Sequence, residues 1–123
     1  DNSNLVYVYD EPPLNTVEMS DSTISAVTTG MHELTTGSLA GAFDKCVVSA
    51  GAKTGSAQVG TEIANGVFVA YAPSEDPEIA VAIVIEKGGT GAALASTAVE
   101  IINAYFADHV AGGDVTGENT LLK

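Results

Sequence analysis

Hydrophobic residues recur along the chain at helical spacing in two segments. From Ser20 onward the spacing is 3, 4 and 3, which marks one face of a helix and is carried by Ile24, Val27, Met31 and Leu34. We expect this helix to begin at an N-cap of Ser20 or Asp21 and to end before Gly37. A second, broader stripe consists of Leu94, Ala98, Ile101 and Tyr105, widened by Val99, Ile102 and Phe106. This stripe predicts a helix that lies on a sheet.

Three β-prone runs, residues 46–58, 67–71 and 79–86, stand between the two predicted helices. Their connections are too short for helical crossovers, so the runs should pair in sequence order as an antiparallel meander. The run 79–85 is apolar on both faces, which predicts an interior strand covered on both sides. The fold class is therefore α/β of the α+β type, an antiparallel sheet with helices packed on it.

The chain of 123 residues has the length of one domain at most. We expect residues 1–19 to form an edge strand at 5–9 and a loop, because two prolines follow the β-prone run. Residues 20–107 should form the folded part. Residues 108–123 turn Gly-rich and polar, and predict a flexible tail.

Charge excludes several classes of partner. Sixteen Asp and Glu face four Lys and no Arg, giving a formal net charge of −12, so nucleic acid and anionic membrane surfaces are disfavoured. The longest apolar run, residues 79–85, is too short to span a bilayer. Cys46 is the only cysteine and is interpreted as a small buried hydrophobic residue. His32 and His109 lack a second ligand at metal-binding spacing and are interpreted as solvated, and we expect no metal and no cofactor.

The stretch Gly-Ala-Lys-Thr-Gly-Ser-Ala-Gln at 51–58 carries the most suggestive chemistry. It is not a phosphate-binding loop, because positions 47 and 52 lack the required glycines. On a strand, Lys53 and Gly55 face one side while Thr54 and Ser56 face the other. Such an edge can bind a peptide or a carboxylate. The Gly-rich stretch 88–91 is interpreted as a tight turn, since the dinucleotide-binding spacing fails.

The order of these features resembles one family. The run 52–58, the Val-Phe-Val-Ala-Tyr-Ala-Pro run at 67–73, the Asp-Pro-Glu-Ile-Ala-Val run at 76–81, and the following Gly-Gly turn and helix resemble the C-terminal part of penicillin-binding protein transpeptidase domains, especially the monofunctional class B kind. The resemblance covers about residues 20–107. It implies a partial penicillin-binding protein or serine β-lactamase-like fold, a five-stranded antiparallel sheet with helices on both faces. This chain would supply the active-site strand, the two strands beyond it and two helices.

The resemblance implies acyl transfer from the D-Ala-D-Ala end of a peptidoglycan stem peptide, through a serine ester, to an amine of a neighbouring strand. Lys53 would attract the substrate carboxylate and support proton movement at the serine. Thr54 and Ser56 would offer hydroxyls to that carboxylate, and the Ser56 N–H would form half of the oxyanion hole. Gly55 would let the substrate lie along the strand, and Gln58 is carried over as a further substrate-binding residue. The sequence departs from the family at Ala52, usually Gly, and at Ser56, usually Thr.

Two other motifs of the family, Ser-x-x-Lys and Ser-x-Asn, occur nowhere in these 123 residues. We therefore expect the chain to be inactive alone, and to bind stem peptide or β-lactams only with the rest of its domain. The exposed apolar strand should associate with that remainder or with another copy. The family implies a location on the extracytoplasmic side of the bacterial membrane. A piece of a non-catalytic β-lactam sensor, of a D,D-carboxypeptidase or of a β-lactamase remains an alternative.

Overall fold

The computed structural model describes residues 15–58, 60 and 63–111. In chain order the elements are α1 (Asp21–Thr36), α2 (Ala40–Phe43), β1 (Gly51–Ala57), β2 (Asn65–Ala72), β3 (Ile79–Ile85), the 3-10 helix η1 (Gly91–Leu94) and α3 (Ala95–Ala111). The strand expected at 5–9 lies outside the described residues. The arrangement confirms the α+β class, with helices packed on a three-stranded antiparallel sheet.

The three strands pair in sequence order, β1-β2-β3, and both pairings are antiparallel, as the short connections predicted. Thr54 stands opposite Phe68, and Phe68 stands opposite Ile83. Strand β1 begins at Gly51 and not at residue 46. The segment before it is bound elsewhere, because the Asn103 side chain accepts from the Val47 N–H at 2.9 Å and donates to the Lys45 carbonyl at 2.8 Å.

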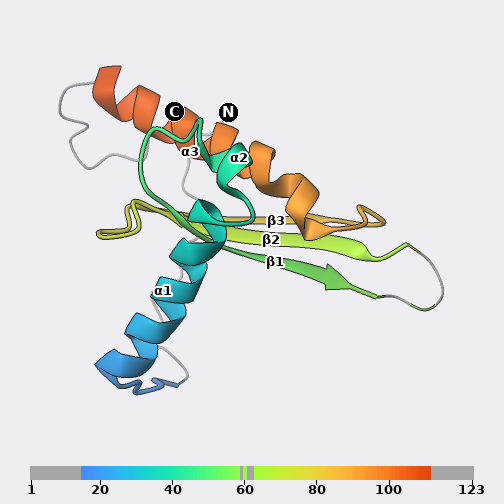
Figure 1. Ribbon diagram of the computed structural model, residues 1–123, viewed down its shortest axis with the longest axis horizontal. Coiled ribbons are helices and arrows are strands. Elements are labelled where there is room, and N and C mark those ends of the chain that lie inside the picture. Colours follow the sequence, from blue (N-terminus) through green and yellow to red (C-terminus); the bar gives the residue numbers. More distant parts are fainter. Residues whose placement is uncertain (1–14, 59, 61–62, 112–123) are drawn as a thin grey trace, which may run out of the picture.

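The core lies between the sheet and α3. In Figure 1, α3 runs along one side of the sheet and α1 leaves from the other. The core side consists of alternate strand residues together with one face of α3, and its buried members include Ala52, Phe68, Ala70, Ala72, Val81, Ala95, Ala98, Val99 and Ile102. Phe68 and Ile102 are the largest fully buried side chains. Burying these apolar side chains stabilises the packing of α3 on the sheet.

The buried face of α3 differs from the predicted stripe. Ala98, Val99 and Ile102 are buried, whereas Ile101 is 41% exposed. Val99 and Ile102, which were predicted to lie at the margin of the apolar stripe, therefore lie at the centre of the buried face. The helix also continues to Ala111, beyond position 107, where the sequence predicted the end of the folded part. Residues 112–123 lie outside the described residues.

Strand β3 is an edge strand of the described sheet, so the expectation of an interior strand covered on both sides is wrong here. Val84, on the face away from α3, is 65% exposed, and Ile85, at the strand end on the α3 side, is 45% exposed, while Val81 faces the core. On the side away from α3, the only described helix is α1, and its contacts with the sheet are made at β1. The apolar residues on that face of β3 are left open to solvent.

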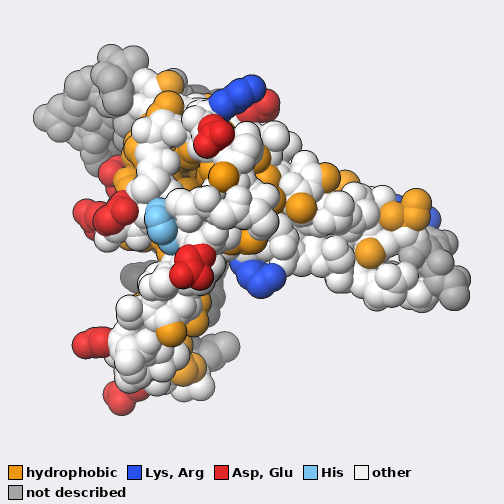
Figure 2. Space-filling model, viewed as in Figure 1, with side chains coloured by type: hydrophobic (Ala, Val, Ile, Leu, Met, Phe, Trp, Pro, Cys, Tyr) orange, Lys and Arg blue, Asp and Glu red, His pale blue; other side chains and the backbone are white. Residues whose placement is uncertain are grey.

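Helix α1 has the predicted boundaries. The Ser20 side chain caps it by accepting from the Thr23 N–H at 3.2 Å, and the Gly37 N–H bonds to the Glu33 carbonyl at its end. Met31 and Leu34 are half-buried, but Ile24 and Val27 are 45% and 57% exposed. Hydrophobic side chains accordingly reach the surface along α1 in Figure 2. Helix α2 follows α1 after a short turn, and its buried Phe43 attaches it to the core.

Candidate functional site

The Lys-Thr-Gly triplet lies in the middle of β1. This strand pairs only with β2 among the described residues, so its second edge is open. Lys53 is exposed, and its ammonium donates to the carbonyl of Thr54 at 2.5 Å. Thr54 is half-buried on the α3 side, while Ser56 on the same side is exposed near the strand end. The strand therefore brings a cation, two hydroxyls and an unpaired backbone edge together.

The backbone direction at Gly55 determines which groups face the open edge. A methyl group on Gly91 would stand 2.5 Å from the Gly55 oxygen, 2.9 Å from the Gly55 nitrogen and 2.2 Å from the Val67 oxygen. Both polar atoms of Gly55 thus lie close to the carbonyl of its partner Val67, on the β2 side. Because residues alternate along an antiparallel ladder, the N–H groups of Thr54 and Ser56 point to the open edge. The Thr54 carbonyl, which accepts from the exposed Lys53, agrees with this direction.

Ala52 lies on the opposite face from the Lys53 side chain. It is fully buried in the core beneath α3. Successive side chains of a strand point to opposite faces, so the Ala52 methyl group stands away from the side on which Lys53 projects. The departure from glycine at this position therefore adds core packing and leaves the Lys53 side uncovered.

Two hollows lie on the α1 side of the sheet, and Lys53 lines the first of them. The first, about 400 Å³, lies between α1 and β1 and is lined by Ala26, Val27, Gly30, Met31, Leu34 and Lys53. The second, about 270 Å³, continues over β2 and β3 and is lined by Met31, Val69, Ala70, Tyr71, Ala80, Val81 and Ala82. Met31 borders both. Lys53 thus stands at the margin of an open apolar surface.

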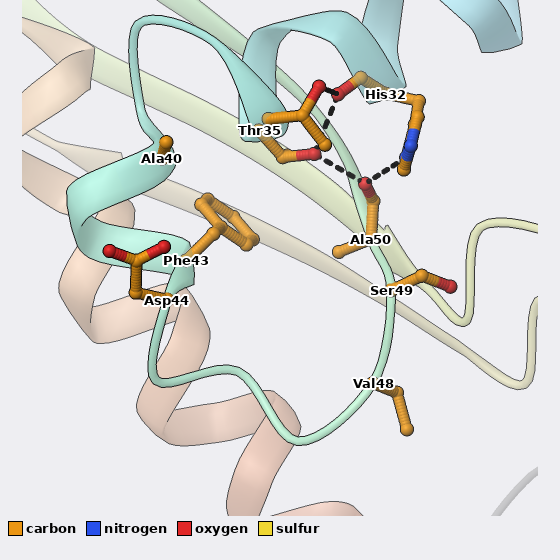
Figure 3. A pocket seen from close by; sticks show the side chains of 9 residues that line it. His32, Thr35, Ala40, Phe43, Asp44, Val48, Ser49 and Ala50 are labelled. Carbon is orange, nitrogen blue, oxygen red and sulfur yellow. Dashed lines mark hydrogen bonds between the residues drawn. The ribbon is translucent and has the colours of Figure 1, made fainter.

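A pair of α1 side chains fixes the start of β1. The Thr35 hydroxyl donates to the Ala50 carbonyl at 2.7 Å, and His32 Nδ1 lies 3.3 Å from the same oxygen, so both converge on Ala50 in Figure 3. Thr35 is buried, and His32 is half-buried and not solvated as predicted. A third hollow, about 320 Å³, lies beside this contact and includes Phe43. It shares no lining residue with the other two hollows.

The turn after β2 also binds the segment before β1. The Ser74 N–H bonds to the Ser49 carbonyl at 3.1 Å and to its hydroxyl at 3.0 Å, and the Ser49 hydroxyl donates to the Glu75 carboxylate. Hydrogen bonds from the Ser49 and Ser74 side chains hold the pKa of Glu75 below its ordinary value. This carboxylate therefore links the turn after β2 to the segment before β1.

The structure brings four of the five predicted site residues together. Lys53, Thr54, Gly55 and Ser56 are consecutive in β1, whereas Gln58 follows the strand end, where its amide lies 3.4 Å from the Gly60 carbonyl. Sequence reasoning missed Thr35 and Gly91. One hint of Thr35 lay in the sequence: it directly follows Leu34, the last residue of the predicted apolar stripe, near the C-terminal end of α1. Cys46 is half-buried against the core.

Within the described residues, no three His, Cys, Asp or Glu side chains gather in a way that would hold a metal ion. Over the same residues, no helix combines the length and the apolar character that crossing a membrane requires.

Comparison with known proteins identifies the family that shares this strand and sheet. The chain matches the family described as "Penicillin binding protein transpeptidase domain" over residues 3–106. The chain belongs to the penicillin-binding protein transpeptidase family. This match confirms the resemblance drawn from the Lys-Thr-Gly stretch and extends it toward the N-terminus.

Relatives of this family span several bacteria. The chain is 37% identical over 107 residues to penicillin-binding protein 2B of Streptococcus pneumoniae, covering 78% of this chain and 16% of that protein. It is 41% identical over 58 residues to the peptidoglycan D,D-transpeptidase PbpA of Mycolicibacterium smegmatis, covering 40% of this chain and 12% of that protein. The solved structure of penicillin-binding protein 2B from Streptococcus pneumoniae strain R6 matches with a TM-score of 0.68 at 31% identity, over 90% of this chain and 20% of that one. The relatives support a class B member, and the chain spans only 16% and 12% of the length of the two curated relatives.

Proposed function

We propose that the chain carries the substrate-binding strand of a peptidoglycan D,D-transpeptidase. The observation that carries this proposal is the placement of Lys53, Thr54, Gly55 and Ser56 on a strand with an open edge, in a chain of the penicillin-binding protein transpeptidase family. An extended peptide binds such an edge through backbone hydrogen bonds. The open N–H groups at 54 and 56 supply the donors for that mode.

In the proposed reaction, a serine from the rest of the domain attacks the carbonyl of the D-Ala-D-Ala peptide bond. The terminal D-Ala leaves as an amine after gaining a proton, and the acyl group remains on the serine as an ester. An amine of a neighbouring stem peptide then attacks the ester, forms the cross-linking amide and returns the serine. Lys53 raises the local positive potential for the substrate carboxylate and for proton transfer at the serine.

Ser56 has two proposed roles. Its N–H points to the open edge of β1 and donates to the developing oxyanion, which is a large source of transition-state stabilisation. Its hydroxyl, with that of Thr54, binds the substrate carboxylate. Gly55 lets the peptide approach the strand, and Gln58 contacts substrate beyond the strand end.

We propose that the remainder of the domain covers the open apolar surface beside Lys53. The hollows at α1 and over β2 and β3 are lined mainly by apolar groups, and such surfaces favour a packed partner over water. A serine delivered by that partner would lie near Lys53. The chain alone holds no Ser-x-x-Lys and is expected to be inert. The family also supports a location outside the cytoplasmic membrane.

Covalent labelling with a reporter penicillin, read by intact mass, tests the proposal. The samples are this chain alone and the parent protein, meaning the chain with the rest of its domain. We expect labelling of the parent only, and a rate at least tenfold lower in Lys53→Ala. Lys45→Ala is the matched control, because Lys45 is an exposed lysine outside β1. An unlabelled parent, or a labelled isolated chain, would contradict the proposal.

Turnover separates the transpeptidase from the alternatives that share this fold. A transpeptidase keeps its penicilloyl ester for long periods and transfers a stem-peptide acyl group to an added amine. Rapid loss of the ester would identify a β-lactamase. Hydrolysis of the stem peptide without transfer would identify a carboxypeptidase, and stable labelling with no peptide reaction would identify a sensor.

A further inference from the structure

Gly91, the first residue of η1, lies against the backbone of two strands. It is buried, and a methyl group at this position would meet the oxygen of Val67 at 2.2 Å and the oxygen of Gly55 at 2.5 Å. Real Cβ atoms do not approach other heavy atoms within 3.0 Å. The atoms in the way are backbone, so no side-chain rotation relieves the contact. Only glycine allows η1 to lie this close to β1 and β2.

The segment that leads to Gly91 is fixed in place. The Gly89 N–H bonds to the Ala64 carbonyl at 2.8 Å, and the Lys87 N–H bonds to the Asn65 side chain at 2.9 Å. Gly89 has φ +77°, a left-handed conformation suited to glycine. These contacts tie the turn to the start of β2. Leu94 then packs over Gly66 at the other end of η1.

The two strands under Gly91 differ in how firmly they are held. Strand β2 pairs on both sides, at Val67 with Gly55 and with Val84. Strand β1 pairs on one side only among the described residues, because it is the edge of the sheet. A group inserted between η1 and the sheet therefore displaces β1 first. The displaced residue is Gly55, which stands between Thr54 and Ser56.

We propose that Gly91 is a positioning residue for acyl transfer. Gly91 contacts the backbone of Gly55 on the α3 side of the sheet. This contact sets the position of the following N–H group, that of Ser56, at the open edge. This inference rests on the proposed function, which makes that N–H an oxyanion donor. Displacing a reacting or stabilising group by about 1 Å can lower a rate about 100-fold. Gly91→Ala should therefore lower the rate of acylation by about 10- to 100-fold.

The test measures acylation of the parent protein by a reporter penicillin in a stopped-flow instrument. The labelled fraction reports how many molecules are folded, and the rate constant at saturating penicillin reports the geometry of those that react. The control is Gly41→Ala. This variant adds a methyl group with no other atom within 4 Å.

We expect Gly91→Ala to show the slower rate constant among the molecules that react, and Gly41→Ala to react at the wild-type rate. A lower labelled fraction with an unchanged rate constant would mean that Gly91 serves folding only, and would overturn the proposal. An unlabelled wild-type parent would instead refute the proposed function. The two failures are therefore distinguishable.

A second variant covers the case in which Gly91→Ala does not fold. Leu94→Ala removes the side chain that lies over Gly66 and loosens η1 on the sheet without inserting a group against the strands. If contact with η1 sets the position of Gly55, the rate constant of the molecules that react should fall in Leu94→Ala as well. A wild-type rate constant in Leu94→Ala would overturn the proposal.

Discussion

The Thr35 hydroxyl donates a 2.7 Å hydrogen bond to the carbonyl of Ala50, and this bond joins the last turn of α1 to the residue before β1. Thr35 is the one polar residue of the described chain that is buried. Because β1 begins at the next residue, the bond fixes the strand that carries Lys53 against the helix that borders the hollow beside it. The geometry around Lys53 therefore depends on a residue of a different element.

Thr35→Val tests this connection. The substitution keeps the shape but removes the donor, so the buried Ala50 carbonyl keeps only the longer contact with His32. A buried acceptor that loses its partner costs about 1–3 kcal/mol. We expect urea unfolding of the parent protein to show that loss in the free energy of unfolding. Thr35→Ser, which keeps the hydroxyl, should recover most of it, and a Val variant as stable as the wild type would contradict the role of the bond.

Glu75 predicts a pH dependence of stability. Its pKa lies below the ordinary value of 4.5 because the Ser49 and Ser74 side chains bond to the ionised carboxylate. A carboxyl group whose pKa is lower in the folded than in the unfolded protein stabilises the fold at pH values above its unfolded-state pKa. This stabilisation is lost as the pH falls through the folded-state pKa. The stability difference between wild type and Glu75→Gln should therefore be present at pH 7 and disappear below about pH 4.5.

The matched control for this experiment is Glu78→Gln, which removes an exposed carboxylate of the same turn. Thermal unfolding of the three proteins between pH 3 and pH 7 is the measurement. A difference for Glu75→Gln that stays constant over that interval, or an equal dependence in Glu78→Gln, would show that the bond from Ser49 does not stabilise the folded state.

The neighbouring pair Ile101 and Ile102 tests which face of α3 is the core face. Ile102 is fully buried, whereas Ile101 is 41% exposed. Truncating a buried isoleucine to alanine costs about 2–5 kcal/mol, because it leaves a cavity. A surface change usually stays within about 0.5 kcal/mol. Urea unfolding should therefore show a much larger loss in the free energy of unfolding for Ile102→Ala than for Ile101→Ala. Similar losses for both variants would mean that α3 is rotated differently on the sheet.

Local patterns determined most of the fold. The apolar spacing and the Ser20 cap predicted helix α1, and the short links between the strands predicted their antiparallel pairing. The structure confirms both. The pattern failed where distant contacts decide the outcome. The exact rotation of α3 depends on how Phe68 and Ile102 pack together, and two candidate stripes one residue apart carry similar hydrophobicity. Residues 46–50 are β-prone but are held by Asn103, which stands more than fifty positions away.

The candidate site was predictable only in part, for a similar reason. The Lys-Thr-Gly triplet and its neighbours are contiguous, so their sequence alone predicts their joint presence on one strand. Gly91 lies in a different element, and its approach to Gly55 follows from the return of the chain over the sheet. A glycine in a turn gives no signal of what it touches. The same holds for Thr35, whose partner is a backbone carbonyl.

The open apolar face beside Lys53 predicts self-association of the isolated chain. Val84 is 65% exposed, stands opposite Val67 and lies on the same face as Val69. We expect sedimentation of the isolated chain to give a mass above 12.4 kDa, and Val84→Lys to lower that mass by disrupting the apolar contact. The control is Val47→Lys, because Val47 is 63% exposed but lies outside the sheet.

The chain has a net charge of −12, so each added lysine reduces the repulsion between copies and by itself favours association. A lower mass for Val84→Lys alone would therefore arise from lost apolar contact and not from charge. The same face is the one proposed to bind the rest of the domain, so Val84→Lys should also weaken complementation by the separated remainder. A monomeric wild-type chain, or equal effects of the two lysine variants, would rule out this face as the associating surface.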